Sequence, residues 1–338
     1  MTYFADNLQS DKLDGHSDWR LLNKNEVPLL FHEPHIDEYY RLPNQSWSFY
    51  LKSILKFHNE TLNVWTHIIA VCMTLAQLFV FSCTVDFIQD SYTWPMLAGF
   101  LSAITMYTCS ATAHCLQSRS EYVHYVAYMF DFAGIGLYCF GTTHVHLFYC
   151  SDEFFCVAAQ KVYIPLAGFI AICVCCCCTV AKLIYTRPYP FTRKLWNITP
   201  VAFAYILLIS PIIIRIYECF IDSNQCSSSI PYHIQQVIWF LISASFFASE
   251  CPHNCFGGIN GILFHGHTLF HITISICTLF QMEAVFIDFS ENHATIRSRP
   301  QPTIASAFLP LAFVWSLELL SIWIFAKAAS KKLKAKPN

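Results

Sequence analysis

Long apolar runs recur along this chain, and each is about as long as the hydrocarbon core of a membrane requires. A helix needs about 20 predominantly apolar residues to cross that core. Such runs are expected to be helical, because an unpaired backbone amide is costly in lipid. Eight runs meet this requirement, of which the sixth is the shortest: 63–83, 92–116, 123–147, 162–184, 196–221, 232–249, 268–289 and 303–325.

The composition agrees with a membrane protein. Of the 338 residues, 55% are hydrophobic and 12% are charged, whereas soluble domains carry about 25% charged residues. A soluble globular domain is therefore excluded. No nucleic-acid partner is expected, since the net charge of −2 reveals no basic domain.

The distribution of basic residues predicts the orientation. With eight spans and a cytosolic N-terminus, the outer side holds only Lys161, Arg215, Arg297 and Arg299, and the rest of the 20 lysine and arginine residues lie inside. Inner loops of membrane proteins are enriched in these residues. This asymmetry favours cytosolic N- and C-termini and an even number of spans.

The loops are short, which predicts one bundle of antiparallel neighbours rather than two domains. In the segment before the first span, Ser46 is expected to cap an amphipathic surface helix from Trp47 to about Phe57. The predicted units are a mobile cytosolic tail (1–26), a cytosolic lead-in with that helix (27–58), a seven-span core (59–289), an outer loop (290–302), an eighth span (303–326) and a basic cytosolic tail (327–338).

Most of the 17 cysteines lie within the apolar runs, where a free thiol behaves as a small hydrophobe. Only Cys150, Cys156 and Cys226 fall near the outer loops. One extracellular disulfide is an open alternative, and a larger disulfide framework is not expected. At the same end, Arg215 and Glu218 are spaced as a helical ion pair.

Two histidines stand at the start of the seventh run, in the segment LFHGHTLFHITISI. His267 and His271 are four residues apart and share a helical face, where both can reach one metal ion. Ser110 and His114 lie near the end of the second run, and Asp131 lies in the third. The predicted orientation places all of them at the cytosolic side.

Three imidazoles with one open position form a typical zinc site. Asp131 needs a partner, because an aspartate in a span costs roughly 2.5 to 3.5 kcal/mol on insertion scales. Together with Ser110, it can orient a water at such a site or remove its proton. The alternative remains open, since a single buried histidine is more often a hydrogen-bonded core residue.

Glu60, Asn63 and His67 share a face at the inner end of the first run. They can form a second shell around the metal or gate a ligand, or they can cap the helix and fill the core; spacing does not distinguish these roles. At the other end, His144 and His146 are two residues apart, so their rings diverge and they are not expected to share a metal.

These motifs resemble those of the progestin and adipoQ receptor family. The pattern Glu-x2-Asn-x3-His starts at Glu60, Ser-x3-His starts at Ser110, and His-x3-His starts at His267. The resemblance implies a seven-helix transmembrane bundle of the adiponectin-receptor type. It also implies a zinc ion held by His114, His267 and His271, with Asp131 and Ser110 nearby.

The segment HNETLNVWTH, the lead-in and the additional eighth span resemble the membrane progestin receptor branch. The inner loop SECPHNCFGG departs from that branch, because Pro252 is kept and the charged pair after it is absent. This departure puts coupling through that loop in doubt.

The resemblance implies a plasma-membrane receptor for a progestin-like steroid that signals to a G protein or another cytosolic effector. Whether the protein is also an enzyme is left open. The alternative is a zinc-dependent hydrolase of ceramide or a related lipid amide, in contact with membrane lipid. In a third interpretation, zinc only holds the helices together.

Overall fold

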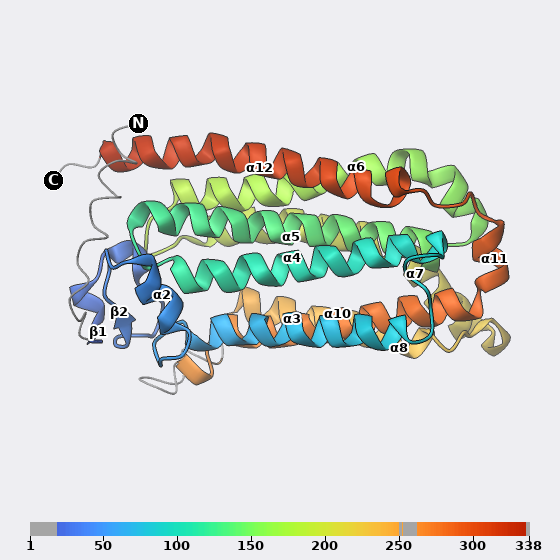
Figure 1. Cartoon of the computed structure of the whole chain (residues 1–338), viewed down its shortest axis with the longest axis horizontal. Helices are drawn as coiled ribbons and strands as arrows, with labels where there is room; N and C mark the ends of the chain where they lie inside the picture. The colour runs from blue at the N-terminus through green and yellow to red at the C-terminus, as the bar shows by residue number, and fades with distance from the viewer. Residues whose placement is uncertain (1–18, 250–251, 253–261, 336–338) are drawn as a thin grey trace.

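The computed structural model describes residues 19–249, 252 and 262–335, and shows a bundle of long helices with a small sheet at one end (Figure 1). The helices of 19 residues or more in this described part are α3 (Thr61–Ser82), α4 (Trp94–Leu116), α5 (Glu121–Cys150), α6 (Glu153–Ile184), α7 (Phe191–Ile221), α8 (Ile230–Ala248), α10 (Gly266–Glu291) and α12 (Ile304–Lys334). They lie side by side along the long axis.

Seven of these helices, within the described residues, are long and apolar enough to cross a membrane. This confirms the expected all-helical membrane protein. The helix outside this set is α8, which coincides with the sixth apolar run. At 19 residues it is the shortest of these helices, and a crossing by α8, and with it an eight-span topology, stays a prediction.

The lead-in is an ordered cover over one end of the bundle. Its strands β1 (Leu21–Leu22) and β2 (Tyr40–Arg41) pair antiparallel, so order begins before the expected boundary at residue 26. The short 3-10 helices η2 (Lys24–Glu26) and η3 (Leu29–Phe31) lie between these strands. Residues 1–18 of the expected tail, residues 336–338 and most of the loop between Ser249 and Ile262 lie outside the described residues.

The surface helix of the lead-in is α2 (Trp47–Ser53). Its predicted cap is confirmed, because the Ser46 side chain accepts a hydrogen bond from the backbone amide of Phe49. The helix ends earlier than the expected Phe57. The Trp65 indole of α3 donates to the carbonyl of Ile54 at 2.9 Å, which holds the chain in the turn that leads into α3.

Arg41 fastens the lead-in to the end of α4. Its fully buried guanidinium donates to the backbone oxygens of Cys115 at 2.6 Å and His114 at 2.8 Å, and to Ser53 Oγ at 2.9 Å. The last carbonyls of a helix have no partner within the helix. Arg41 satisfies two of them and thereby fixes the lead-in beside His114.

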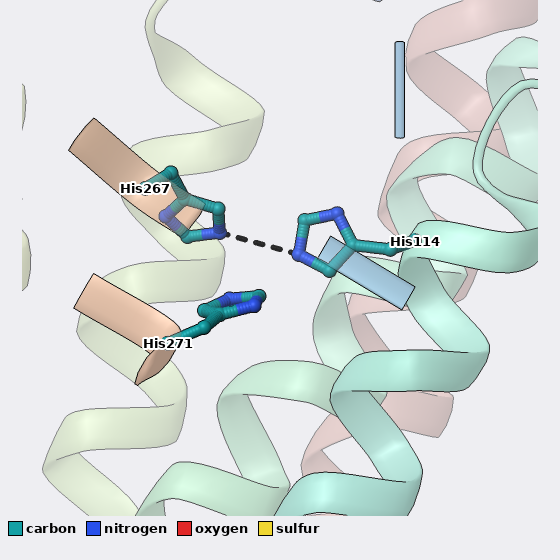
Figure 2. A group of neighbouring side chains, drawn as sticks. All are labelled: His114, His267 and His271. Atoms are coloured by element: carbon teal, nitrogen blue, oxygen red, sulfur yellow. Dashed lines mark hydrogen bonds between the residues drawn. The ribbon is translucent and has the colours of Figure 1, made fainter. Parts of the chain in front are cut away.

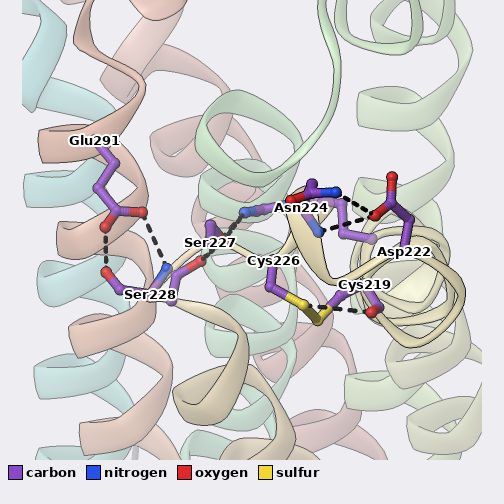
Figure 3. The surroundings of a disulfide bond; sticks show 9 residues. Cys219, Asp222, Asn224, Cys226, Ser227, Ser228 and Glu291 are labelled. Atoms are coloured by element: carbon purple, nitrogen blue, oxygen red, sulfur yellow. Dashed lines mark hydrogen bonds between the residues drawn. A yellow bond between two sulfur atoms is a disulfide. The ribbon is translucent and has the colours of Figure 1, made fainter.

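At the opposite end, a disulfide joins Cys219 in the last turn of α7 to Cys226 (Figure 3). Between them lies the short 3-10 helix η5 (Ser223–Gln225). Cys226 was among the expected candidates, but its partner is in α7 rather than in an outer loop. The reason is that the chain turns back immediately after α7, which brings the two Cα atoms to 4.5 Å. Cys150 and Cys156 are free thiols.

The expected pairing of Arg215 with Glu218 is wrong. Arg215 binds Asp288 of α10 through two hydrogen bonds of 2.6 and 2.7 Å. Asp288 is fully buried and Glu218 is exposed. A bidentate contact to a buried carboxylate is the stronger interaction, so this bond joins α7 to α10.

The remaining elements extend the bundle at both ends. The outer connection expected over residues 290–302 contains the short helix α11 (His293–Ser298), and the 3-10 helix η4 (Ser91–Thr93) precedes α4. The last helix, α12, continues past the expected boundary at residue 326 to Lys334. Lys332 in its final turns donates to the carbonyl of Leu183 at 2.6 Å, which holds the extension against the end of α6.

Helices α5, α6 and α12 approach closely at Gly136. A Cβ atom at this position would lie 2.2 Å from Glu318 Oε1 and 2.6 Å from the backbone oxygen of Ala171. Both distances are far below van der Waals contact, so only glycine fits without displacement of a neighbour.

We therefore expect Gly136→Ala to lower the stability of the detergent-solubilised protein by about 1 to 3 kcal/mol, as overpacking in a core does. The measurement is the temperature at which the monodisperse peak in size-exclusion chromatography is lost. Gly168→Ala is the matched control, because its nearest neighbour is a side-chain methyl group of Val314 at 3.3 Å. If the two variants lose the peak at the same temperature, the close approach of α6 and α12 to Gly136 is contradicted.

Candidate metal centre

The candidate metal centre consists of His114, His267 and His271 (Figure 2). His114 projects from the last turn of α4, and the other two project from the first turns of α10. One ligand atom of each lies within 4.8 Å of the others, and all three side chains are buried or half-buried. The structure thus brings together the three histidines that sequence spacing had selected.

Two ring nitrogens face each other across this centre. The Nε2 atoms of His114 and His267 are 3.2 Å apart. The other ring nitrogen of His114, Nδ1, is 2.8 Å from the carboxylate of Glu60. A carboxylate holds the proton of an imidazole on the nitrogen that it contacts, which leaves the Nε2 lone pair of His114 directed toward His267.

Glu60 is a buried carboxylate that immediately precedes α3. It accepts hydrogen bonds from Asn63 Nδ2 at 2.8 Å and from Gln117 Nε2 at 3.2 Å. Burial by itself would raise the pKa of Glu60, but the adjacent His114 and Asn63 outweigh it and lower this pKa below its usual range. The side chain is therefore an ionised partner of the centre as well as a residue at the helix start.

Asn63 and His67 also lie against the centre. Asn63 Oδ1 accepts a hydrogen bond from Thr268 of α10 at 2.7 Å. The His67 ring stacks on His271 with centroids 3.7 Å apart. Neither ring nitrogen of His67 has a hydrogen-bond partner among the described residues.

The sequence analysis missed several residues that support the centre. Thr66 Oγ1 is 3.2 Å from Nδ1 of His271, and Gln117 links Glu60 to His124 through a contact of 2.7 Å. Arg41 holds the backbone of His114 in place. No local pattern marks these residues, because each acts across helices far apart in the sequence.

Ser110 and Asp131 are buried beside each other, on α4 and α5. Ser110 and His114 are both near enough to interact electrostatically with the Asp131 carboxylate. The compact group of ligand atoms contains the three histidines without Asp131. Asp131 thus stands next to the centre rather than within it.

The donor set fits a zinc ion. Zn²⁺ in open sites takes three protein ligands, commonly imidazoles, and leaves the fourth position to water or substrate. A carboxylate behind one histidine is the usual support of such a ligand. The buried triad can hold a metal ion, and Glu60 supplies that support.

An apolar groove lies elsewhere on the bundle, between α6 and α7. Its volume is about 540 Å³. No residue of the centre lines this groove. Its lining includes Leu166, Phe169, Trp196, Pro200 and Phe203. Its lining suits an apolar ligand or the acyl chain of a lipid.

Comparison with known proteins shows similarity to membrane progestin receptors. The profile of the family described as Haemolysin-III related matches residues 55–282, a range that includes the whole centre. Membrane progestin receptor beta from Homo sapiens is 38% identical over 280 residues, which cover 82% of this chain and 79% of that protein. Membrane progestin receptor alpha-B from Danio rerio is 37% identical over 269 residues, 79% of this chain and 76% of that protein.

Removing the carboxylate behind His114 tests the centre. We expect Glu60→Gln to lower zinc affinity by about 10- to 100-fold, as loss of such a support typically does. The measurement is the zinc retained per chain, by elemental analysis, after dialysis against a graded series of chelator concentrations. Glu283→Gln on α10, whose carboxylate contacts Gln77, is the matched control. Equal retention in both variants would remove Glu60 from the centre.

Proposed function

The chain belongs to the haemolysin-III-related family of progestin and adipoQ receptors, and on that basis we propose that it is a membrane receptor for a progestin-like steroid. The observation that carries the proposal is the match to membrane progestin receptors over about 80% of the chain. The receptor would signal to a G protein or another cytosolic effector. Its ligand would enter from the surrounding membrane lipid.

The proposal includes a zinc ion held by His114, His267 and His271. The fit of three imidazoles, two buried and one half-buried, to an open zinc site supports it. A bound zinc ion would supply Lewis acidity toward an oxygen of the ligand. The chain itself would orient His114 through Glu60 and support the ring of His271 through His67.

The proposed orientation has both termini in the cytosol and the receptor in the plasma membrane. Two independent features support the orientation. The basic end of α12 and the lead-in lie at the same end of the bundle (Figure 1). The Cys219–Cys226 disulfide lies at the other end, and disulfides persist in the oxidising compartment outside the cytosol.

This orientation requires α8 to cross the membrane as well. Its pairing with α10 supports that crossing, since Ser229 and His233 near the start of α8 contact Asp288 near the end of α10. The two helices therefore run antiparallel. Eight crossings would return the chain to the side on which it began.

A second candidate function is hydrolysis of ceramide or a related lipid amide. It is favoured by one observation, the buried pair Asp131 and Ser110 beside the centre. Asp131 would accept the proton of an attacking water, and Ser110 would hold the carboxylate in position. The two functions are compatible, because a receptor can signal through the product of a hydrolysis.

Steroid binding is the direct test of the receptor. Membranes that contain the protein are expected to bind labelled progesterone saturably and in competition with unlabelled steroid. His271→Ala should lose this binding, because the ligand would lie at the centre, and His144→Ala at the far end should retain it. Absence of saturable binding by the unaltered protein would remove the receptor assignment.

The same experiment locates the ligand. Phe203→Trp would narrow the groove between α6 and α7 without touching the centre. If this variant loses binding and His271→Ala keeps it, the steroid occupies the groove instead of the centre.

The hydrolase is tested with Asp131→Asn, which keeps the size of the side chain and removes the base. We expect release of fatty acid from ceramide to fall by at least about 100-fold, the usual contribution of a general base. Zinc content should stay unchanged, because Asp131 is not a member of the ligand group. If the unaltered protein releases fatty acid only at the background rate, equally with and without chelator, the protein is not a hydrolase of this kind.

A further inference from the structure

A second group of metal-binding side chains lies at the end of the bundle opposite to the candidate metal centre. It consists of His146 and Cys150 on α5 and His233 on α8, and we refer to it as the distal cluster. One ligand atom of each residue lies within 4.8 Å of the others. The exposed fractions of the three residues are 0, 1 and 0%, so the group is shielded from water and lipid.

Helical spacing explains two of the three members of the distal cluster. His146 and Cys150 are four residues apart and share one face of α5. His144, two residues before His146, points elsewhere, as its spacing predicts. The sequence analysis compared the two histidines with each other and did not pair His146 with a cysteine.

His146 presents an unused ring nitrogen. Its Nδ1 atom is 2.7 Å from the backbone oxygen of Thr142, an acceptor that holds the ring proton on Nδ1. The buried Nε2 atom then carries a lone pair, and it has no hydrogen-bond partner among the described residues. A buried acceptor without a partner destabilises the folded protein, and a cation would satisfy it.

His233 is held in place by a chain of polar contacts. Its Nε2 atom is 2.9 Å from Asp288 Oδ2, and its Nδ1 atom is 2.7 Å from the amide nitrogen of Gln236, which a metal bound at Nδ1 would displace. Asp288 in turn accepts hydrogen bonds from Arg215 and from Ser229. A carboxylate fixed behind a histidine is the arrangement that supports metal-binding imidazoles.

Asp288 also adjoins the thiol of Cys150. Asp288 thus supports His233 and lies near Cys150, and it stands outside the compact group of three ligand atoms. The positive charge of Arg215 and the negative charge of Asp288 balance each other. The thiolate of Cys150, whose proton is released to solvent when the metal binds, would then balance the whole charge of Cu⁺ and half of the charge of Zn²⁺.

We propose that the distal cluster is a second metal site, in which His146, Cys150 and His233 bind a cation that prefers sulfur and imidazole ligands. Ions of this class are Zn²⁺ and Cu⁺. The site is independent of the candidate metal centre, since it shares no residue with it and lies at the other end of α5 and α10. It also does not depend on the proposed steroid ligand.

The metal content of the purified protein tests this proposal. The purified protein loaded with Zn²⁺ is expected to hold about two ions per chain, because each cluster binds one. His114→Ala and Cys150→Ala should each lose one ion, and the double variant should lose both. Cys175→Ala, which removes another buried free thiol, is the matched control and should keep both ions. Parallel loading with Cu⁺ under reducing conditions distinguishes the two cations.

A spectroscopic measurement tests whether the Cys150 thiolate is a metal ligand. After loading with Co²⁺, a thiolate ligand produces a charge-transfer band in the near ultraviolet, which imidazole ligands do not. The band should persist in His114→Ala and vanish in Cys150→Ala. If Cys150→Ala does not fold, His146→Gln is the second variant, since its amide can still donate to Thr142 and it should weaken metal binding by at least about tenfold.

Two results would overturn the proposal of a second metal site. If the unaltered protein holds one ion, which His114→Ala removes and Cys150→Ala leaves in place, the distal cluster is a hydrogen-bonded network without a metal. Retention of the charge-transfer band in Cys150→Ala would likewise exclude this thiol as a ligand.

Discussion

The contact between Glu60 and His114 is the interaction on which the arrangement at the lead-in end of the bundle depends. A carboxylate with 1% of its surface exposed is tolerated only when it is paired. Glu60 is paired with an imidazole of α4 and with two amide groups, those of Asn63 and Gln117. The cost of burying the charge is thereby offset by contacts that also join α3 to α4 and set the rotation of the His114 ring.

The same device appears at the other end of the molecule. Asp288 is fully buried, holds His233 of α8, and is itself held by Arg215 of α7. At each end of the bundle a buried carboxylate thus orients a histidine. In a helical bundle whose exterior is apolar, hydrophobic burial discriminates little between neighbouring helices. Polar contacts of this kind therefore decide which helices adjoin at each end.

Local patterns anticipated much of the structure. Hydropathy located the eight long helices of the part of the chain that the structure describes, and the cap at Ser46 was correct to the residue. The four-residue spacing of His267 and His271, combined with the depth of His114, selected the three members of the candidate metal centre. The errors share one cause. Arg215 was paired with a neighbour on its own helix, and Cys219 was overlooked inside an apolar run, because each has a partner set by how the chain folds back.

The sequence by itself determined that this protein is a membrane bundle, where its helices lie, and which histidines reach a common depth. These properties follow from the length and period of apolar runs, which are local quantities. Only the tertiary structure decided that Glu60 contacts His114 and that Asp288 contacts Arg215. It also decided that His146 and Cys150 lie beside His233. Such contacts depend on the rotation of each helix about its axis and on which helices lie next to it. Both are set by the packing of the whole bundle.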